Sequence, residues 1–204
     1  YMLEKGVVGE SVADIADRSR RLVVVEKFGE YLAKIHDNKI VGWGELVSIN
    51  EARCGSYLEY YEYLLPKVDE GLLPIVKRVL ENTNESCLNH ADTCYVHTYV
   101  DREENFWGLI DFDDVLGAPC LYDLAEFYGS LDGDMEMWER FMLGYSKFGQ
   151  KVDIDSLEFL VNQYLIFLDS YLWYAKSGRA DLEQDKQDSL ARVTMLREKI
   201  KLLG

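Results

Sequence analysis

The chain has 204 residues, which is enough for one large helical domain or two small ones. Its 37 Asp and Glu residues outnumber 22 Lys and Arg residues, and the formal net charge is −15. This charge repels phosphate backbones and anionic lipid head groups, which argues against nucleic acid or membrane partners, whereas a cationic small molecule would be attracted. The four cysteines are irregularly spaced and form no C-x-x-C pair, and no apolar run approaches the ~20 residues that span a bilayer. These features predict a cytoplasmic protein.

The chain opens on an apolar stretch, Tyr1-Met2-Leu3-Glu4, which a glycine-containing turn follows at once. This stretch predicts a short strand. A strand in first position favours a sequence that begins inside a larger protein. The alternative is that Met2 is a native start. Residues 14–38 then carry an apolar stripe at steps of three and four, which predicts a helix. A loop is predicted at Gly42-Trp43-Gly44.

Two further helices are predicted, over residues 56–65, ended by Pro66, and from Leu73-Pro74 onward. The β-branched and aromatic runs 98–100 and 106–110 flank a polar turn at residues 101–105, which predicts a hairpin. After Pro119 the apolar spacing predicts helices around Tyr122–Leu131, Trp138–Tyr145, Leu157–Tyr171 and Asp181–Leu203. The predicted fold class is therefore mainly α (α+β), one domain with a small β element among its helices.

Titratable side chains gather at the open end of this hairpin. His97 and Asp111 stand equally far from residue 104, so they are predicted to be cross-strand neighbours. Asp92 lies five residues before His97 and is close enough in sequence to curl over the same point. Phosphoryl transfer uses such a cluster, because one carboxylate orients the attacking hydroxyl and another holds the divalent metal that neutralises the phosphates.

The residues resemble a known family at five landmarks in the same order. His90-Ala91-Asp92 with His97, and Ile110-Asp111-Phe112, are similar to the H-G-D-x-x-x-x-N and I-D-F/W motifs of the aminoglycoside phosphotransferase, choline kinase and fructosamine kinase group. Leu121–Ala125, after Pro119, resembles the G-D-P-x-x-D-L-A element of that group. Leu32–His36 with Gly42–Gly44 resembles its L-A-x-L-H helix end with the G-[FY]-G loop. Met2–Glu4 with Gly9-Glu10 resembles its hinge strand.

The resemblance implies the helical C-terminal lobe of a protein-kinase-like fold, with residues 1–10 as a remnant of the interlobe hinge and residues 11–204 as the lobe. It implies a phosphotransferase (kinase) that uses ATP and Mg²⁺ on a small-molecule hydroxyl, with the ATP lobe absent from this chain, which alone would be inactive. The implied roles are catalytic base for Asp92, metal ligands for Asp111, His97 and Asp113, and adenine contacts for Leu3, Glu4 and Lys5. His90 and Asp123 would be structural members of the catalytic loop, with Asp123 as a buried carboxylate that is hydrogen-bonded to the loop and ties it to the helix beneath. An exposed hinge strand also predicts self-association.

Two residues depart from the family pattern. His97 replaces the asparagine that is the second metal ligand, and an imidazole serves Mg²⁺ poorly, so Mn²⁺ is a possible substitute. Ala91 replaces the glycine of H-G-D. The alternative to an enzyme is therefore a degenerate, non-catalytic binding or regulatory module.

Other functions of the same residues remain open from sequence. His90, Cys94 and His97 with Asp92 can be interpreted as a zinc cluster, although their spacing matches no common zinc motif. His36 is interpreted as a helix-end residue and Trp43 as a packing residue. The substrate and the nucleotide preference are not predicted.

Overall fold

The computed structural model describes residues 9–100 and 107–204. The predicted first strand, with the hinge residues Leu3, Glu4 and Lys5, lies outside the described residues, and so does the predicted turn at 101–105. The self-association that was predicted through the hinge strand therefore stays a prediction.

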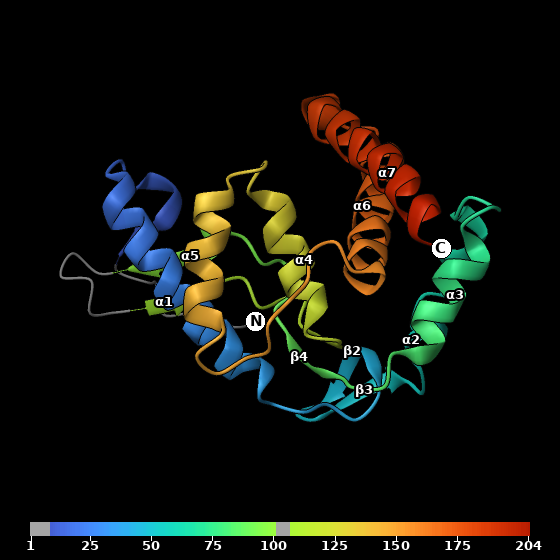
Figure 1. The fold of residues 1–204 in the computed structure, drawn as a ribbon, viewed down its shortest axis with the longest axis horizontal. Coiled ribbons are helices and arrows are strands. Elements are labelled where there is room, and N and C mark those ends of the chain that lie inside the picture. The colour runs from blue at the N-terminus through green and yellow to red at the C-terminus, as the bar shows by residue number, and fades with distance from the viewer. Residues whose placement is uncertain (1–8, 101–106) are drawn as a thin grey trace.

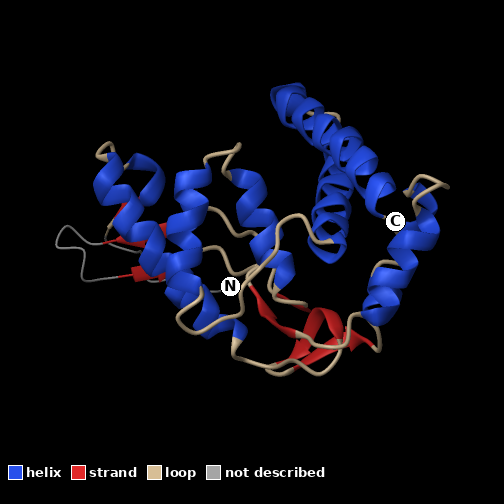
Figure 2. Ribbon diagram, in the orientation of Figure 1, coloured by secondary structure: helices blue, strands red, loops and turns tan. Residues whose placement is uncertain are grey.

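The described residues form a mainly α structure with small antiparallel sheets (Figures 1 and 2). Its α-helices are α1 (Arg18–His36), α2 (Tyr57–Tyr60), α3 (Leu73–Asn82), α4 (Leu121–Ser130), α5 (Met135–Tyr145), α6 (Leu157–Ser177) and α7 (Glu183–Leu203). Apart from α2, they lie where the apolar periodicity predicts them. The predicted fold class, mainly α with a small β element, is confirmed.

Helix α2 is much shorter than the predicted helix over residues 56–65. Its continuation follows tighter turns, since Tyr61 N–H donates to Leu58 O and Leu64 N–H donates to Tyr61 O, three residues back. These turns bury the side chains of Tyr61 and Leu64. The prediction failed because packing of these large side chains outweighed the preference for a regular helix.

Two small sheets carry the β structure. One has the order β1-β5-β6, and the other has the order β3-β2-β7-β4, all pairs antiparallel. The strands are β1 (Glu10–Ser11), β2 (Trp43–Ser48), β3 (Glu51–Cys54), β4 (Cys87–Asn89), β5 (Thr98–Val100), β6 (Trp107–Leu109) and β7 (Leu116–Ala118). The predicted hairpin corresponds to β5 and β6, and β1 adds an edge strand that begins at Glu10, the last residue of the predicted hinge segment.

The predicted loop at Gly42-Trp43-Gly44 is wrong, because β2 begins at Trp43. The two glycines have φ of +93° and +80°, conformations that other residues rarely adopt, and they misled the prediction. The ring of Trp43 is buried 4.9 Å from that of Tyr57, so the predicted packing role of Trp43 is confirmed.

Two buried apolar clusters lie on either side of α4. The first joins α1, α5 and part of α4 through Phe28, Phe127 and Phe141, and α1 and α5 run side by side in Figure 1. The second joins α2, α3, α6 and α7, and Tyr122 of α4 packs against both clusters. Because Asp123 follows Tyr122, it lies at the junction of the two clusters. Within the described ranges, no helix has the length and apolarity needed to cross a bilayer.

Candidate active site

A loop between β4 and β5 rests on the carboxylate of Asp123. The backbone N–H groups of His90 and Ala91 each donate to a different oxygen of this carboxylate, both at 2.8 Å. Asp123 is fully buried, and its own N–H donates to the side chain of Asn89 at 3.3 Å. The prediction that Asp123 is buried and hydrogen-bonded to this loop is confirmed. Two neutral donors alone rarely support a buried charge, so a cationic partner is expected.

That partner is His36, the last residue of α1. Its Nε2 lies 3.1 Å from Asp123 Oδ2, and its Nδ1 lies 2.8 Å from the Tyr145 hydroxyl. Burial by itself lowers the pKa of His36, but the hydrogen bond and charge of Asp123, with a contribution from Cys120, raise that pKa to about 9. Burial likewise opposes ionisation of Asp123, yet His36 and the two loop amides bring its pKa below the usual range.

The interpretation of His36 as a helix-end residue was correct for its position and missed its partner. The sequence contained an indication that both residues matter, because His36 ends the L-A-x-L-H motif, Asp123 lies in the D-L-A motif, and the family resemblance includes both motifs. Nothing in their spacing indicated that His36 and Asp123, 87 residues apart, meet.

Ala91 adopts a left-handed backbone conformation, with φ of +63°. The same residue donates its N–H to Asp123 Oδ1. An alanine pays roughly 1–2 kcal/mol for this conformation, and a glycine does not. Ala91, which stands where the family has glycine, is therefore a strained residue of this loop.

His90 joins this loop to the segment after β6. Its Nε2 lies 2.8 Å from the carbonyl oxygen of Ile110, and its ring meets that of Phe112 edge to face at 4.6 Å. The imidazole is buried, and its Nδ1 has no hydrogen-bond partner among the described residues. The contacts fit the structural role that the resemblance implied for His90.

His97 lies between the carboxylates of Asp92 and Asp111. Its Nδ1 is 3.3 Å from Asp92 Oδ2, and its Nε2 is 3.9 Å from Asp111 Oδ2. The two carboxylates are about half exposed, whereas the imidazole is mostly buried. The structure thus brings together the three residues that the sequence predicted to meet.

The predicted register was wrong by one residue. Thr98 pairs with Leu109 and Val100 with Trp107, so His97 faces Ile110, whose N–H donates to His97 O at 3.1 Å. Asp111 instead lies one residue beyond the pairing, with φ of +65°. The predicted proximity of Asp111 to His97 is therefore present, but it follows from this left-handed residue after the strand and not from symmetric pairing about residue 104.

The zinc interpretation is supported for three of its four residues. Ligand atoms of Asp92, Cys94 and His97 lie within 4.8 Å of one another. His90 is outside this group, because its Nε2 is directed at Ile110. Burial raises the pKa of the Cys94 thiol to about 11, so a metal ion bound here would have to displace its proton.

The donors around Asp111 determine which divalent ion suits the predicted metal site. Asp111 offers a carboxylate, the hard ligand that Mg²⁺ and Mn²⁺ both accept. The other group close to that carboxylate is the His97 imidazole, which suits Mn²⁺ better than Mg²⁺. Asp113 is exposed, and neither Asp113 nor Asp111 belongs to the two groups of described residues whose ligand atoms lie close enough together to hold an ion. The residues present therefore fit a divalent ion that tolerates nitrogen.

A cavity of about 630 Å³ lies beside the loop and reaches Ala91. Its walls combine acidic side chains and aromatic rings, namely Glu45, Asp113, Asp114, Glu126 and Asp169 with Tyr60, Tyr63, Tyr122, Trp173 and Tyr174. The described residues that line it include no Lys or Arg. Trp173 is 57% exposed and Tyr63 is 55% exposed, so both rings are accessible. Carboxylates and open aromatic faces are the groups that bind organic cations. We call this cavity the acidic cavity.

Glu126 links the acidic cavity to the catalytic loop. Its Oε2 accepts the N–H of Thr93 at 2.7 Å, one residue after Asp92. Burial, helped by the charge of Asp123, raises the pKa of Glu126 to about 8. Sequence analysis missed Glu126, and its place three residues after Asp123, on the same face of α4, was the available signal.

A carboxylate-anchored loop, an adjacent hairpin and an aspartate just after that hairpin define the kinase-like class of phosphotransferase folds. The model of the phosphotransferase enzyme family (APH) matches residues 2–160. The chain belongs to this family.

Solved structures agree on the fold. A thermostable mutant of aminoglycoside phosphotransferase APH(4)-Ia, in ternary complex with AMP-PNP and hygromycin B, matches with a TM-score of 0.67 and 15% identity over 94% of this chain and 69% of that one. The choline kinase LicA from Streptococcus pneumoniae matches with a TM-score of 0.61 and 15% identity over 95% of this chain and 66% of that one. An aminoglycoside-3'-phosphotransferase of type VIII matches with a TM-score of 0.56 and 18% identity over 80% of this chain and 66% of that one. Identities this low establish the fold alone. The search of curated proteins gave no match.

Proposed function

We propose that this chain supplies the catalytic and substrate-binding lobe of an ATP-dependent phosphotransferase that acts on a hydroxyl of a cationic small molecule. The observation that carries the proposal is the placement of Asp92 and Asp111 on either side of His97, on a loop that borders the acidic cavity. The share of each solved relative that this chain covers supports a further nucleotide-binding part in the complete protein.

In this proposal Asp92 is the general base. Its half-exposed carboxylate accepts the proton of the substrate hydroxyl as the oxygen attacks the γ-phosphoryl group and ADP leaves. Asp123 and His90 hold the loop, so that Asp92 keeps its orientation. Asp111, with His97 and Asp113 as further candidates, would hold the divalent ion, and a bound ion would neutralise the phosphate charge. Leu3, Glu4 and Lys5 remain the proposed adenine contacts.

The lining of the acidic cavity supports a cationic substrate. Carboxylates attract an ammonium group over a distance, and an exposed ring such as Trp173 contributes about 0.5–2 kcal/mol when it contacts a cation. Choline and hygromycin B appear in the descriptions of the solved relatives and are suitable first probes. All four cysteines carry free thiols, which supports the proposed cytoplasmic location.

The same geometry favours a second candidate, a non-catalytic binding module. A protonated His97 between Asp92 and Asp111 would replace the cation and hold the site together without a metal. An assay of ATP-dependent phosphorylation with the full-length protein, in Mg²⁺ or Mn²⁺ and with each probe, separates the two.

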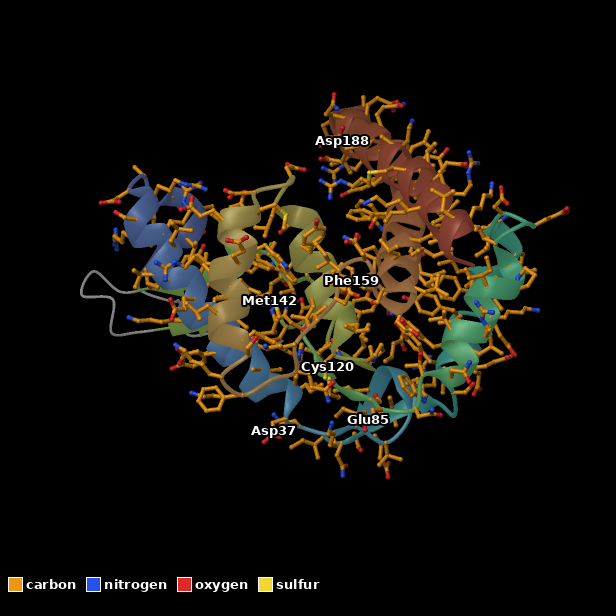
Figure 3. The ribbon with its side chains drawn as sticks, in the orientation of Figure 1. Asp37, Glu85, Cys120, Met142, Phe159 and Asp188 are labelled. Carbon is orange, nitrogen blue, oxygen red and sulfur yellow. The ribbon has the colours of Figure 1, made fainter. Side chains whose placement is uncertain are left out.

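Under the enzyme proposal, Asp92→Asn lowers kcat by about 10²–10⁴-fold while the melting temperature hardly changes. Asp188→Asn is the matched control, because Asp188 is exposed at the far end of α7 in Figure 3. Nucleotide binding without turnover in either metal, unaffected by Asp111→Ala, would favour the binding module.

A further inference from the structure

A second cluster of side chains that could hold a metal ion lies next to Asp123, whose Oδ2 is 3.1 Å from His36 Nε2. One ligand atom each of His36, Cys87 and Cys120 lies within 4.8 Å of the others. The two cysteines take no part in the proposed reaction. We propose that His36, Cys87 and Cys120 form a zinc site.

Three separate elements hold these ligands. Cys87 begins β4 and pairs with Ala118 of β7. Cys120 follows Ala118 by two residues and directly precedes α4, and His36 ends α1. Strand pairing and a helix end therefore fix the positions of the three side chains, and the site needs no reordering of a loop.

The spacing of the ligand atoms is close to that of a zinc site. Zinc–sulfur and zinc–nitrogen bonds of roughly 2.3 and 2.0 Å place tetrahedral ligands about 3.5–3.8 Å apart. Ligand atoms within 4.8 Å reach this spacing through small side-chain rotations. Two thiolates and one imidazole are also a donor set that zinc prefers to harder cations.

The hydrogen bond between His36 and Asp123 suits this role. A histidine that binds a metal usually donates its other ring N–H to a carboxylate, which orients the ring and makes the ligand more basic. Since His36 Nε2 faces Asp123 at 3.1 Å, Nδ1 is the nitrogen left for zinc, in exchange for its hydrogen bond with Tyr145.

A cavity of about 700 Å³ gives an ion access to the cluster. Its lining includes His36, Cys120 and Tyr145, together with Asp37 and Glu85 near its mouth. Figure 3 shows Cys120, Asp37 and Glu85 in the same region, below α4. With three protein ligands, the fourth zinc position would face this cavity and hold a water molecule or a small anion. An ion bound here would lie next to Asp123, which anchors the loop of Asp92.

The test is zinc titration of the purified, chelator-stripped and reduced chain, followed by competition with a chromophoric chelator. One zinc ion per chain is expected, with protons released on binding. Cys87→Ser and Cys120→Ser should each weaken binding by at least about tenfold, whereas Cys54→Ser, the matched control on β3, should not. His36→Gln should also weaken binding.

Cobalt provides a readout that needs no variant. The Co²⁺ form of the unmodified chain should show the charge-transfer absorption of two thiolate ligands and the visible bands of a tetrahedral ion. Absence of zinc binding while four free thiols are titrated would overturn the proposal. So would binding that Cys94→Ser abolishes and Cys120→Ser leaves intact, because the ion would then lie with Asp92 and His97. None of these measurements requires phosphotransferase activity.

Discussion

His36 Nε2 lies 3.1 Å from Asp123 Oδ2, and both side chains are buried. This buried pair joins the end of α1 to the start of α4 and supports the loop that carries Asp92. Because the same carboxylate also accepts two backbone N–H groups, its loss would leave three buried partners without a hydrogen-bond acceptor.

We predict that Asp123→Ala lowers the free energy of unfolding by about 3–5 kcal/mol, the usual cost of removing one partner of a buried ion pair. Asp37→Ala is the matched control, since Asp37 is exposed one residue after His36 and should change stability by less than about 1 kcal/mol. Urea unfolding followed by circular dichroism measures both. Equal midpoints for the two variants would contradict the structural role of Asp123.

The His36–Asp123 pair also predicts a pH dependence of stability. The folded-state pKa of His36, about 9, lies above the ordinary value of 6.5. The protonated imidazole therefore stabilises the fold fully below pH 6.5, and this contribution is lost as the pH rises through about 9. At neutral pH it is on the order of 2–3 kcal/mol, because one pKa unit corresponds to about 1.4 kcal/mol.

The measurement compares a His36→Gln chain with the unmodified His36 chain, both in a Cys120→Ser background, so that the neighbouring thiol does not titrate. The two chains are unfolded with urea between pH 6 and 10, with a chelator present. The chain with His36 should have the larger free energy of unfolding, and the difference should decrease as the pH rises. A constant difference across this range would show that His36 is neutral in the folded protein.

The strain at Ala91 predicts a stabilising substitution. Ala91→Gly removes the cost of a left-handed alanine and should raise the free energy of unfolding by about 0.5–1 kcal/mol. Ala191→Gly is the matched control, because Ala191 is exposed within α7 and the same change there should cost about 1 kcal/mol. Thermal unfolding of both variants measures whether the change in stability is positive for Ala91→Gly and negative for Ala191→Gly. A loss of stability in both would mean that Ala91 is unstrained.

His97→Asn tests what the imidazole between the two carboxylates does. An amide oxygen suits Mg²⁺ better than a nitrogen ligand, so the variant should raise Mg²⁺-dependent ATP affinity of the full-length protein by about tenfold. Calorimetry with Mg²⁺ and Mn²⁺ measures this change, and His97→Leu, which offers no ligand, is the control. If His97→Asn only lowers the melting temperature, His97 is structural and the enzyme proposal loses most of its support.

Trp173 tests the use of the acidic cavity. Trp173→Ala should weaken binding of a quaternary ammonium probe such as choline by about 5–30-fold, the effect of losing a cation–π contact of roughly 1–2 kcal/mol. Phe148→Ala is the control, since Phe148 is 61% exposed and lies outside the acidic cavity. Calorimetric titration of both variants at fixed ionic strength compares the affinities. Equal affinities would place the cation elsewhere.

The helices other than α2, the hairpin, and the proximity of Asp92, His97 and Asp111 were predictable from the residue pattern alone. Helical periodicity and strand alternation are local properties, and residues separated by one hairpin have few ways to meet. The family motifs likewise indicated that Asp123 is buried.

The side chains that complete those sites depend on the tertiary packing of the chain. It placed His36 against Asp123, set the hairpin register one residue from the symmetric one, and turned Gly42–Gly44 into the start of β2. It also brought Cys87 and Cys120 to His36 and assembled the acidic cavity from α2, α4 and α6. These contacts join residues far apart in the chain, and their geometry depends on how the two apolar clusters pack on α4, which no local pattern encodes.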